Sequence, residues 1–316
     1  MSRSETHSCG KRQHQRPLVP PPRLRPGDTI GITAPASPFD AEQFYLGVGL
    51  LESAGFKVLV PKNLFLKNGY LAGSDSQRAA LFMDMVTDPV VKAVLCARGG
   101  YGSMRILPLI DYTCIRDKPK IVVGFSDVTA LLAALYTRCG LVTFHGPVVA
   151  GLPGLDEQSL IALMSAIAGA APIDIDAPKG ETVCPGSGTG PVLAGNLTTL
   201  CHLIGTPYMP PTKGHLLLLE DRGEAPYRVD RMLSQLRLAG CLETIAGLAF
   251  GSFDDCGRPD ELSRIFADHF SDRRFPVLTG LDVGHGKRNL TIPIGITATL
   301  DADRRRLTYH HPATME

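Results

Sequence analysis

The first half of the chain alternates short, almost continuously apolar runs with helical segments, and this alternation constrains the fold most strongly. The apolar runs are residues 28–37, 56–60, 91–97 and 120–126, and the helical segments are residues 40–54, 76–88 and 127–140. Strands that are apolar on both faces are typical of a parallel sheet covered by helices on both sides. The pattern therefore predicts an α/β fold that begins with a doubly wound, mostly parallel sheet.

The second half mixes its elements less regularly. Strands are predicted at 215–221 and 245–253, helices near 227–238 and 260–270, and a β-hairpin within 294–310. Gly, Pro and Ser collect between residues 152 and 190, and the glycine-rich stretch 185–196 is typical of a linker. We expect a disordered tail at 1–23, a first domain at 24–160, a linker at 161–189 and a second, mixed α/β domain at 190–316.

The composition argues against two classes of partner, nucleic acid and membranes. The chain has 316 residues with 32 Lys and Arg against 31 Asp and Glu, and this balance gives no electrostatic reason to bind nucleic acid. Aromatic residues make up only 6% and Trp is absent, so a stacking surface for single strands is not expected. No apolar run reaches the length needed to span a membrane. We expect neither nucleic acid nor a membrane as a partner.

The eight cysteines are widely scattered, and none forms a C-x-x-C pair. Such cysteines are typical of reduced thiols buried in a core, and they suggest neither a metal site nor a redox motif. The N-terminal segment is polar, basic and rich in proline, and it has no apolar stretch of the kind found in signal peptides. These features favour a cytoplasmic protein.

The segment "GFSD" places Ser126 directly after a predicted buried strand and directly before a helix. A serine on such a turn exposes its hydroxyl beside the free N–H groups of a helix N-terminus, which can stabilise an oxyanion. The alternative is a simple helix cap formed by Ser126 or Asp127. Upstream, Gly99, Gly100 and Gly102 follow another strand, either as a tight turn or as a loop that approaches a ligand.

A serine nucleophile needs a base and an acid that orients the base. His145 and His285 each follow a predicted strand and are the candidate bases. The segment "LLLLEDRGE" offers three carboxylates where a strand ends, namely Glu220, Asp221 and Glu224. Spacing alone does not choose among these carboxylates.

Seven segments, taken together and in order, resemble the LD-carboxypeptidase family, which are serine peptidases of the muramoyltetrapeptide carboxypeptidase type. They are "GDTIGITAPAS", "ARGGYGSMRIL", "GFSDVTALL", "FHGP", "AGNLTTLCHLIGTPYMP", "LLLLEDRGEAPYRVDRMLSQL" and "LTGLDVGHGKRNLTIPIG". The resemblance extends from about residue 24 to about residue 309. It implies a catalytic triad of Ser126, Glu220 and His285, and an oxyanion hole formed by Asp127 with Gly99 or Gly100. Such a triad requires no metal or organic cofactor.

The resemblance also implies a reaction, the removal of the C-terminal D-alanine from a cytoplasmic murein tetrapeptide during cell-wall recycling, and a homodimer. A carboxypeptidase must bind a free carboxylate, for which Arg98, Arg228 and Lys287 are candidates. Tyr101 and Tyr208 are further candidates for the substrate cleft. Because Ser126 precedes the predicted linker and the other triad members follow it, we expect the active site between the domains.

Three other functions deserve comparison with this one. A microcin-immunity branch of the same family cleaves aminoacyl-sulfamoyl-adenylates in place of murein peptides. A non-catalytic peptide-binding module would keep the fold without turnover. A glutamine amidotransferase would need a cysteine nucleophile on a G-x-C-x-G turn, and no cysteine here has that setting.

Overall fold

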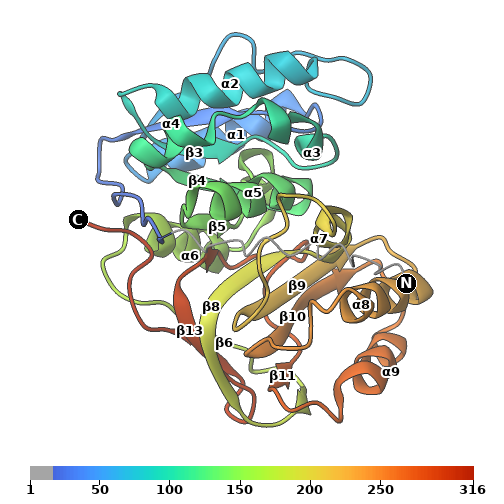
Figure 1. Cartoon of the computed structure of the whole chain (residues 1–316). Coiled ribbons are helices and arrows are strands. Elements are labelled where there is room, and N and C mark those ends of the chain that lie inside the picture. Colours follow the sequence, from blue (N-terminus) through green and yellow to red (C-terminus); the bar gives the residue numbers. More distant parts are fainter. Residues whose placement is uncertain (1–16) are drawn as a thin grey trace, which may run out of the picture.

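The computed structural model describes residues 17–316, which form two β-sheets with helices packed around and between them (Figure 1). The elements of the first half lie above, and those of the second half lie below. Among residues 17–316, no helix combines the length and the apolar character that crossing a bilayer requires.

The first sheet has six strands in the order β12-β5-β4-β3-β1-β2. Its strands are β1 (Thr29–Thr33), β2 (Lys57–Leu59), β3 (Val91–Cys96), β4 (Ile121–Gly124), β5 (Thr143–His145) and β12 (Ile292–Ile294). Strands β1 to β5 run parallel to one another, and β12 adds to β5 in the antiparallel direction. The predicted doubly wound, mostly parallel sheet is confirmed.

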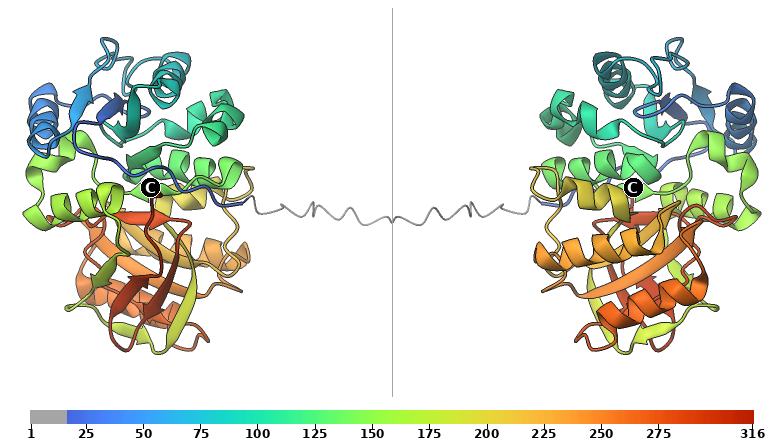
Figure 2. Two further views of the ribbon diagram at one scale, coloured as in Figure 1. Left: turned by 90° about the vertical axis from the view of Figure 1, so that its left-hand side faces the viewer. Right: turned by 90° about the vertical axis from the view of Figure 1, so that its right-hand side faces the viewer.

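Helices cover both faces of this sheet. They are α1 (Ala41–Ser53), α2 (Asp75–Thr87), α3 (Ser103–Ile106), α4 (Tyr112–Asp117), α5 (Thr129–Cys139) and α6 (Glu157–Ala168). Helix α1 lies on one face and α2 on the other (Figure 2), as alternating right-handed crossovers require. Ser74 caps α2 through a reciprocal pair of hydrogen bonds with Gln77, and Gly140 ends α5 with φ +72°.

The second sheet has eight strands in the order β6-β14-β13-β8-β9-β10-β11-β7. Its strands are β6 (Asp174–Asp176), β7 (Thr182–Cys184), β8 (Ser187–Asn196), β9 (Leu216–Arg222), β10 (Gly247–Asp254), β11 (Val277–Leu278), β13 (Thr297–Asp301) and β14 (Arg306–Tyr309). The helices of this half are α7 (Leu197–Leu203), α8 (Pro226–Leu238) and α9 (Pro259–Phe270). Strands β8 to β11 are parallel and the other pairs are antiparallel, so the predicted mixed α/β second half is confirmed.

The glycine-rich stretch 185–196 is not a linker, because most of it forms β8, a central strand of the second sheet. Its glycines permit close contact between backbones. A β carbon at Gly188 would lie 1.9 Å from the carbonyl oxygen of Ala246, and one at Gly190 would lie 2.1 Å from that of Gly214. The predicted linker 161–189 holds the larger part of α6, strands β6 and β7 and the first residues of β8, and these three strands pair within the second sheet.

Most of the predicted tail, residues 1–16, lies outside the described residues. The remainder is bonded to the body of the protein, since the N–H of Val19 donates to the carbonyl of Gly140 and the N–H of Arg23 donates to that of Met315. The division of the chain into domains stays a prediction, and one strand crosses it: β12 comes from the second half but lies in the first sheet.

Candidate active site

Ser126 lies on a sharp turn between a strand and a helix. Strand β4 ends at Gly124, and Ser126 begins a 3₁₀ turn, Ser126–Val128, that leads directly into α5. The serine has φ +60°, a left-handed backbone conformation that side-chain-bearing residues adopt at a free-energy cost of about 1–3 kcal/mol. Strain of this kind collects at functional sites, where the surrounding structure enforces it.

The loop after β3 packs directly against this turn. A β carbon at Gly99 would lie 2.9 Å from the β carbon of Ser126, so only glycine fits there without a shift. Gly100 has φ +105°, and a β carbon on it would lie 2.5 Å from Ser37 Oγ. The carboxylate of Asp127 accepts a hydrogen bond from the N–H of Ser103 at 2.8 Å. The structure thus brings together the predicted nucleophile and the predicted oxyanion-hole residues.

The loop after β3 is fixed by hydrogen bonds from Arg78, whose side chain is fully buried. Its guanidinium donates to the carbonyl oxygens of Pro35 and Gly102, at 2.8 Å in the case of Gly102, and pairs with Asp75. A buried arginine requires such partners, because an unpaired buried charge is strongly destabilising. Arg78 therefore joins the loops that follow β1 and β3.

Glu220 and His285 form a hydrogen-bonded pair, with 2.7 Å between Glu220 Oε2 and His285 Nδ1. Glu220 is fully buried near the end of β9. Burial raises the pKa of its carboxyl group, and the hydrogen bond with His285 opposes that effect. A carboxylate bound to Nδ1 orients the imidazole so that its other nitrogen can act as a base.

The other two carboxylates of the segment have different partners. Asp221 accepts hydrogen bonds from Asn196 Nδ2 at 2.9 Å and from the backbone and hydroxyl of Thr198, at the start of α7. Glu224 pairs with Arg228 at 3.4 Å on the surface. The three-dimensional structure thus distinguishes the carboxylates that sequence spacing could not.

The loop that carries His285 is fixed by hydrogen bonds. The N–H of His285 donates to Ser252 Oγ at 3.0 Å, and the N–H of Gly284 donates to Asn289 Oδ1 at 3.1 Å. The ring of Phe125, next to the serine, lies 4.7 Å from the imidazole of His285 between centroids. The elements of both halves of the chain therefore meet at this loop.

A pocket of about 550 Å³ contains this site. It is lined by Phe39, Asp40, Gln43, Arg98, Gly99, Gly100, Phe125, Ser126, Val148, Ala150, Gly151, Arg222 and His285. Of the predicted substrate-binding residues, Arg98 lines it, and its guanidinium also donates to the carbonyl oxygen of Pro38 at 2.7 Å. Ser126 and His285 both face this one cavity.

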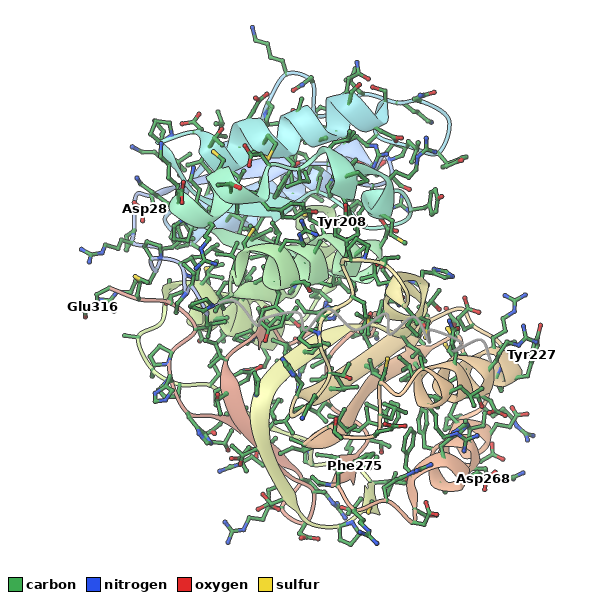
Figure 3. All side chains as sticks on the ribbon, in the orientation of Figure 1. Asp28, Tyr208, Tyr227, Asp268, Phe275 and Glu316 are labelled. Carbon is green, nitrogen blue, oxygen red and sulfur yellow. The ribbon has the colours of Figure 1, made fainter. Side chains whose placement is uncertain are left out.

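The other predicted substrate-binding residues lie outside the pocket. Tyr101 is exposed and packs edge-on against Tyr70. Tyr208 packs beside the ring of Tyr112, near α5 (Figure 3). Arg228 lies on α8 beside Tyr227, which is labelled at the edge of the molecule in Figure 3. Lys287 is exposed, and its carbonyl oxygen accepts a hydrogen bond from the N–H of Asp156.

Sequence analysis missed several pocket residues, of which Arg222 is the most informative. It follows Glu220 by two positions, and the twofold period of a strand places both side chains on the same face of the sheet. Phe39 and Asp40 follow the loop after β1, at the same edge of the first sheet as Ser126. That edge is where ligands bind in open α/β sheets, so the strand assignments contained the signal.

The second candidate base, His145, is fully buried at the end of β5, and neither ring nitrogen has a hydrogen-bond partner among residues 17–316. Burial lowers the pKa of His145 to about 3, with a smaller contribution in the same direction from His285. His145 does not line the pocket that holds Ser126, whereas His285 does, so His285 is the better placed of the two candidate bases.

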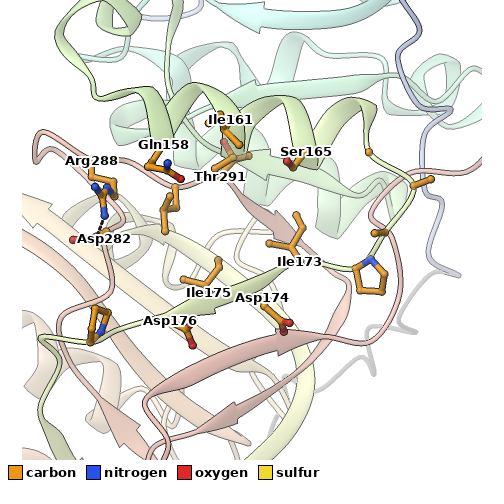
Figure 4. A pocket seen from close by; sticks show the side chains of 17 residues that line it. Gln158, Ile161, Ser165, Ile173, Asp174, Ile175, Asp176, Asp282, Arg288 and Thr291 are labelled. Atoms are coloured by element: carbon orange, nitrogen blue, oxygen red, sulfur yellow. Dashed lines mark hydrogen bonds and ion pairs between the residues drawn. The ribbon is translucent and has the colours of Figure 1, made fainter.

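A second pocket, of about 610 Å³, lies between α6, residues 169–176 and the loop 282–291 (Figure 4). It combines apolar side chains such as Ile161 and Ile173 with the ion pair of Arg288 and Asp282. None of the predicted catalytic residues lines it. In residues 17–316, His, Cys, Asp and Glu side chains form no group of three or more that could hold a metal ion.

The fold and the pocket are typical of an α/β hydrolase, since a serine with a left-handed backbone and an imidazole held at Nδ1 by a buried carboxyl group line one cavity. Residues 30–146 match the LD-carboxypeptidase N-terminal domain, and residues 189–300 match the LD-carboxypeptidase C-terminal domain. The chain therefore belongs to the LD-carboxypeptidase family.

Individual relatives agree with this assignment. The probable murein peptide carboxypeptidase of Bacillus subtilis is 38% identical over 291 residues, which cover 89% of this chain and 91% of that protein. A putative carboxypeptidase of Streptomyces coelicolor is 38% identical over 304 residues, which cover 94% of this chain and 98% of that protein.

Solved structures share the fold. MccF, a microcin C7 self-immunity protein, in complex with glutamyl sulfamoyl guanosine, matches with a TM-score of 0.87 and 26% identity, covering 95% of this chain and 100% of that one. The muramoyltetrapeptide carboxypeptidase of Oxalobacter formigenes matches with a TM-score of 0.78 and 30% identity, covering 89% of this chain and 97% of that one.

Proposed function

We propose that this chain is a serine carboxypeptidase that removes the C-terminal D-alanine from a murein tetrapeptide by cleaving an L,D peptide bond. The reaction would take place in the cytoplasm during cell-wall recycling, and the enzyme would act as a homodimer. The observation that carries the proposal is that His285, held by Glu220 at 2.7 Å, lines the same pocket as Ser126, whose φ is +60°. The murein-peptide names of a 38% identical relative and a 30% identical structure support the choice of substrate.

In the proposed mechanism, Ser126 Oγ attacks the carbonyl carbon of the terminal peptide bond while His285 takes the hydroxyl proton. Glu220 holds the imidazole by Nδ1 and stabilises its positive charge. The oxyanion would accept hydrogen bonds from the backbone N–H groups of Asp127 and of Gly99 or Gly100. His285 then protonates the amine of the departing D-alanine, and a water molecule hydrolyses the acyl-enzyme by the same route in reverse.

The test is mass spectrometry of murein tetrapeptide incubated with the wild-type protein and with Ser126→Ala. The wild type should release D-alanine, and the variant should turn over more slowly by a factor on the order of 10⁴–10⁶. Binding of the tetrapeptide without any release of D-alanine by the wild type would instead indicate a peptide-binding module.

A second candidate substrate is an aminoacyl-sulfamoyl-adenylate, and the structural similarity to MccF bound to glutamyl sulfamoyl guanosine favours it. Ser126 would then attack the carbonyl carbon of an acyl group attached to a nucleotide analogue, with His285 and Glu220 in the same roles. Parallel assays with the tetrapeptide and with glutamyl sulfamoyl adenosine separate the two. Cleavage of the adenylate alone would replace the murein substrate in the proposal.

A further inference from the structure

We propose that Arg222 forms the subsite for the free carboxylate of the substrate, so that it gives the enzyme its preference for a chain end. This inference rests on the proposed carboxypeptidase function and names the group that would recognise the terminal D-amino acid. Sequence analysis suggested Arg98, Arg228 and Lys287 for this task, and of these only Arg98 lines the pocket.

The position of Arg222 follows from the alternation of side chains along β9. Glu220 points to His285, and Asp221 points the opposite way, to Asn196 and Thr198. Arg222, the last residue of the strand, returns to the side of Glu220 and lines the pocket with His285. The strand thus carries the partner of the base and a cation on one face, two residues apart.

The chemistry of the leaving group favours a cation in that place. In D-alanine the amine and the carboxylate are bonded to the same carbon, so the carboxylate lies close to the nitrogen that receives the proton. His285 delivers that proton, and the group that binds the carboxylate must therefore lie beside His285. Arg222 belongs to the second sheet, which also holds Glu220, whereas Arg98 lies in the loop next to Ser126.

The guanidinium of Arg222 is available for a ligand. Its one ion pair among the described residues is with Asp255 at 3.3 Å, and the two side chains are 56% and 71% exposed. An exposed ion pair of this kind contributes little to the stability of the fold. The arginine can therefore exchange Asp255 for a substrate carboxylate with only a small loss of stability. Its planar group suits a carboxylate, which it can bind through two parallel hydrogen bonds.

The experiment compares two substrates, the tetrapeptide with its free C-terminal carboxylate and the same peptide with a C-terminal amide. For the wild type, kcat/KM should favour the free acid on the order of 10²-fold, as expected for a charge-assisted pair in a cleft. Arg222→Gln should bring this ratio close to one, and Arg222→Lys should retain part of it. Arg98→Gln and Arg228→Gln should keep the wild-type ratio.

The outcomes separate the inference from the proposed function. If the wild type cleaves neither peptide, the proposed function fails. If it cleaves the acid with preference and Arg222→Gln keeps the same ratio, the subsite is elsewhere, even when both rates fall together. A ratio that collapses in Arg98→Gln and persists in Arg222→Gln would overturn the inference in favour of the loop beside the serine.

Discussion

Gly284 has no room for a β carbon, which would lie 2.5 Å from Ser252 Oγ and 2.9 Å from Glu220 Oε2. Its φ of +124° also disfavours any side chain. The residue therefore permits the close approach of the His285 loop to Glu220, on which the orientation of the imidazole depends.

Gly284→Ala should lower kcat for the tetrapeptide by a factor on the order of 10², because displacing a catalytic group by about 1 Å has that effect. Steady-state kinetics with circular dichroism as a check on folding would measure it. Gly286→Ala is the matched control, since the nearest atom to its β carbon would be 3.7 Å away, and it should keep the wild-type kcat. An unchanged kcat in Gly284→Ala would show that catalysis does not depend on the close contact between Gly284 and Glu220.

At the scale of elements, β5 carries His145 into the core, and this affects how stability depends on pH. The folded protein keeps the pKa of His145 at about 3, chiefly through burial, whereas the unfolded chain has the ordinary value of 6.5. Between these values the unfolded state binds one more proton than the folded state. Stability contributed by the neutral ring is therefore complete above about pH 6.5 and is lost as the pH falls toward 3.

His145→Leu should reduce the pH dependence of unfolding in that window by up to about 1.4 kcal/mol per pH unit, the equivalent of one proton. Urea titrations between pH 4 and pH 7 would measure the slope. His202→Leu is the control, because that ring is exposed in the folded protein. Equal slopes for His145→Leu and the wild type would contradict the assignment.

The elements that sequence analysis predicted are those whose signal is local. Strands such as β3, β4 and β9 are apolar runs, and β8 was missed because Gly188 and Gly190 serve contacts with distant backbones. The residues of the candidate site likewise differ in how local their signal is. The turn at Ser126 can be recognised from the sequence around it, whereas the choice of Glu220 depends on its contact with His285, 65 residues away in the sequence. Arg228 and Lys287 were suggested as carboxylate-binding residues because they are positively charged, and the fold places both outside the pocket.

At the scale of the whole molecule, the two halves share both a sheet and a loop. Strand β12 pairs with β5 in the first sheet, immediately after the loop that carries His285. Arg288 of that loop pairs with Asp156 at 2.6 Å, and the N–H of Asn289 donates to Ser159 Oγ at 2.9 Å. The distance between the serine and the histidine is therefore set by contacts that belong to neither half alone.

Because β12 completes the first sheet, the two halves should unfold together. Calorimetry of the wild type should show one transition, with activity lost over the same temperature range. Ile294→Ala removes a fully buried side chain of β12 and should destabilise the protein by about 2–5 kcal/mol, which lowers the temperature of that single transition. Two separate transitions in the wild type, or an Ile294→Ala variant in which only one part melts earlier, would mean that each half is stable by itself and that the active site is assembled by docking.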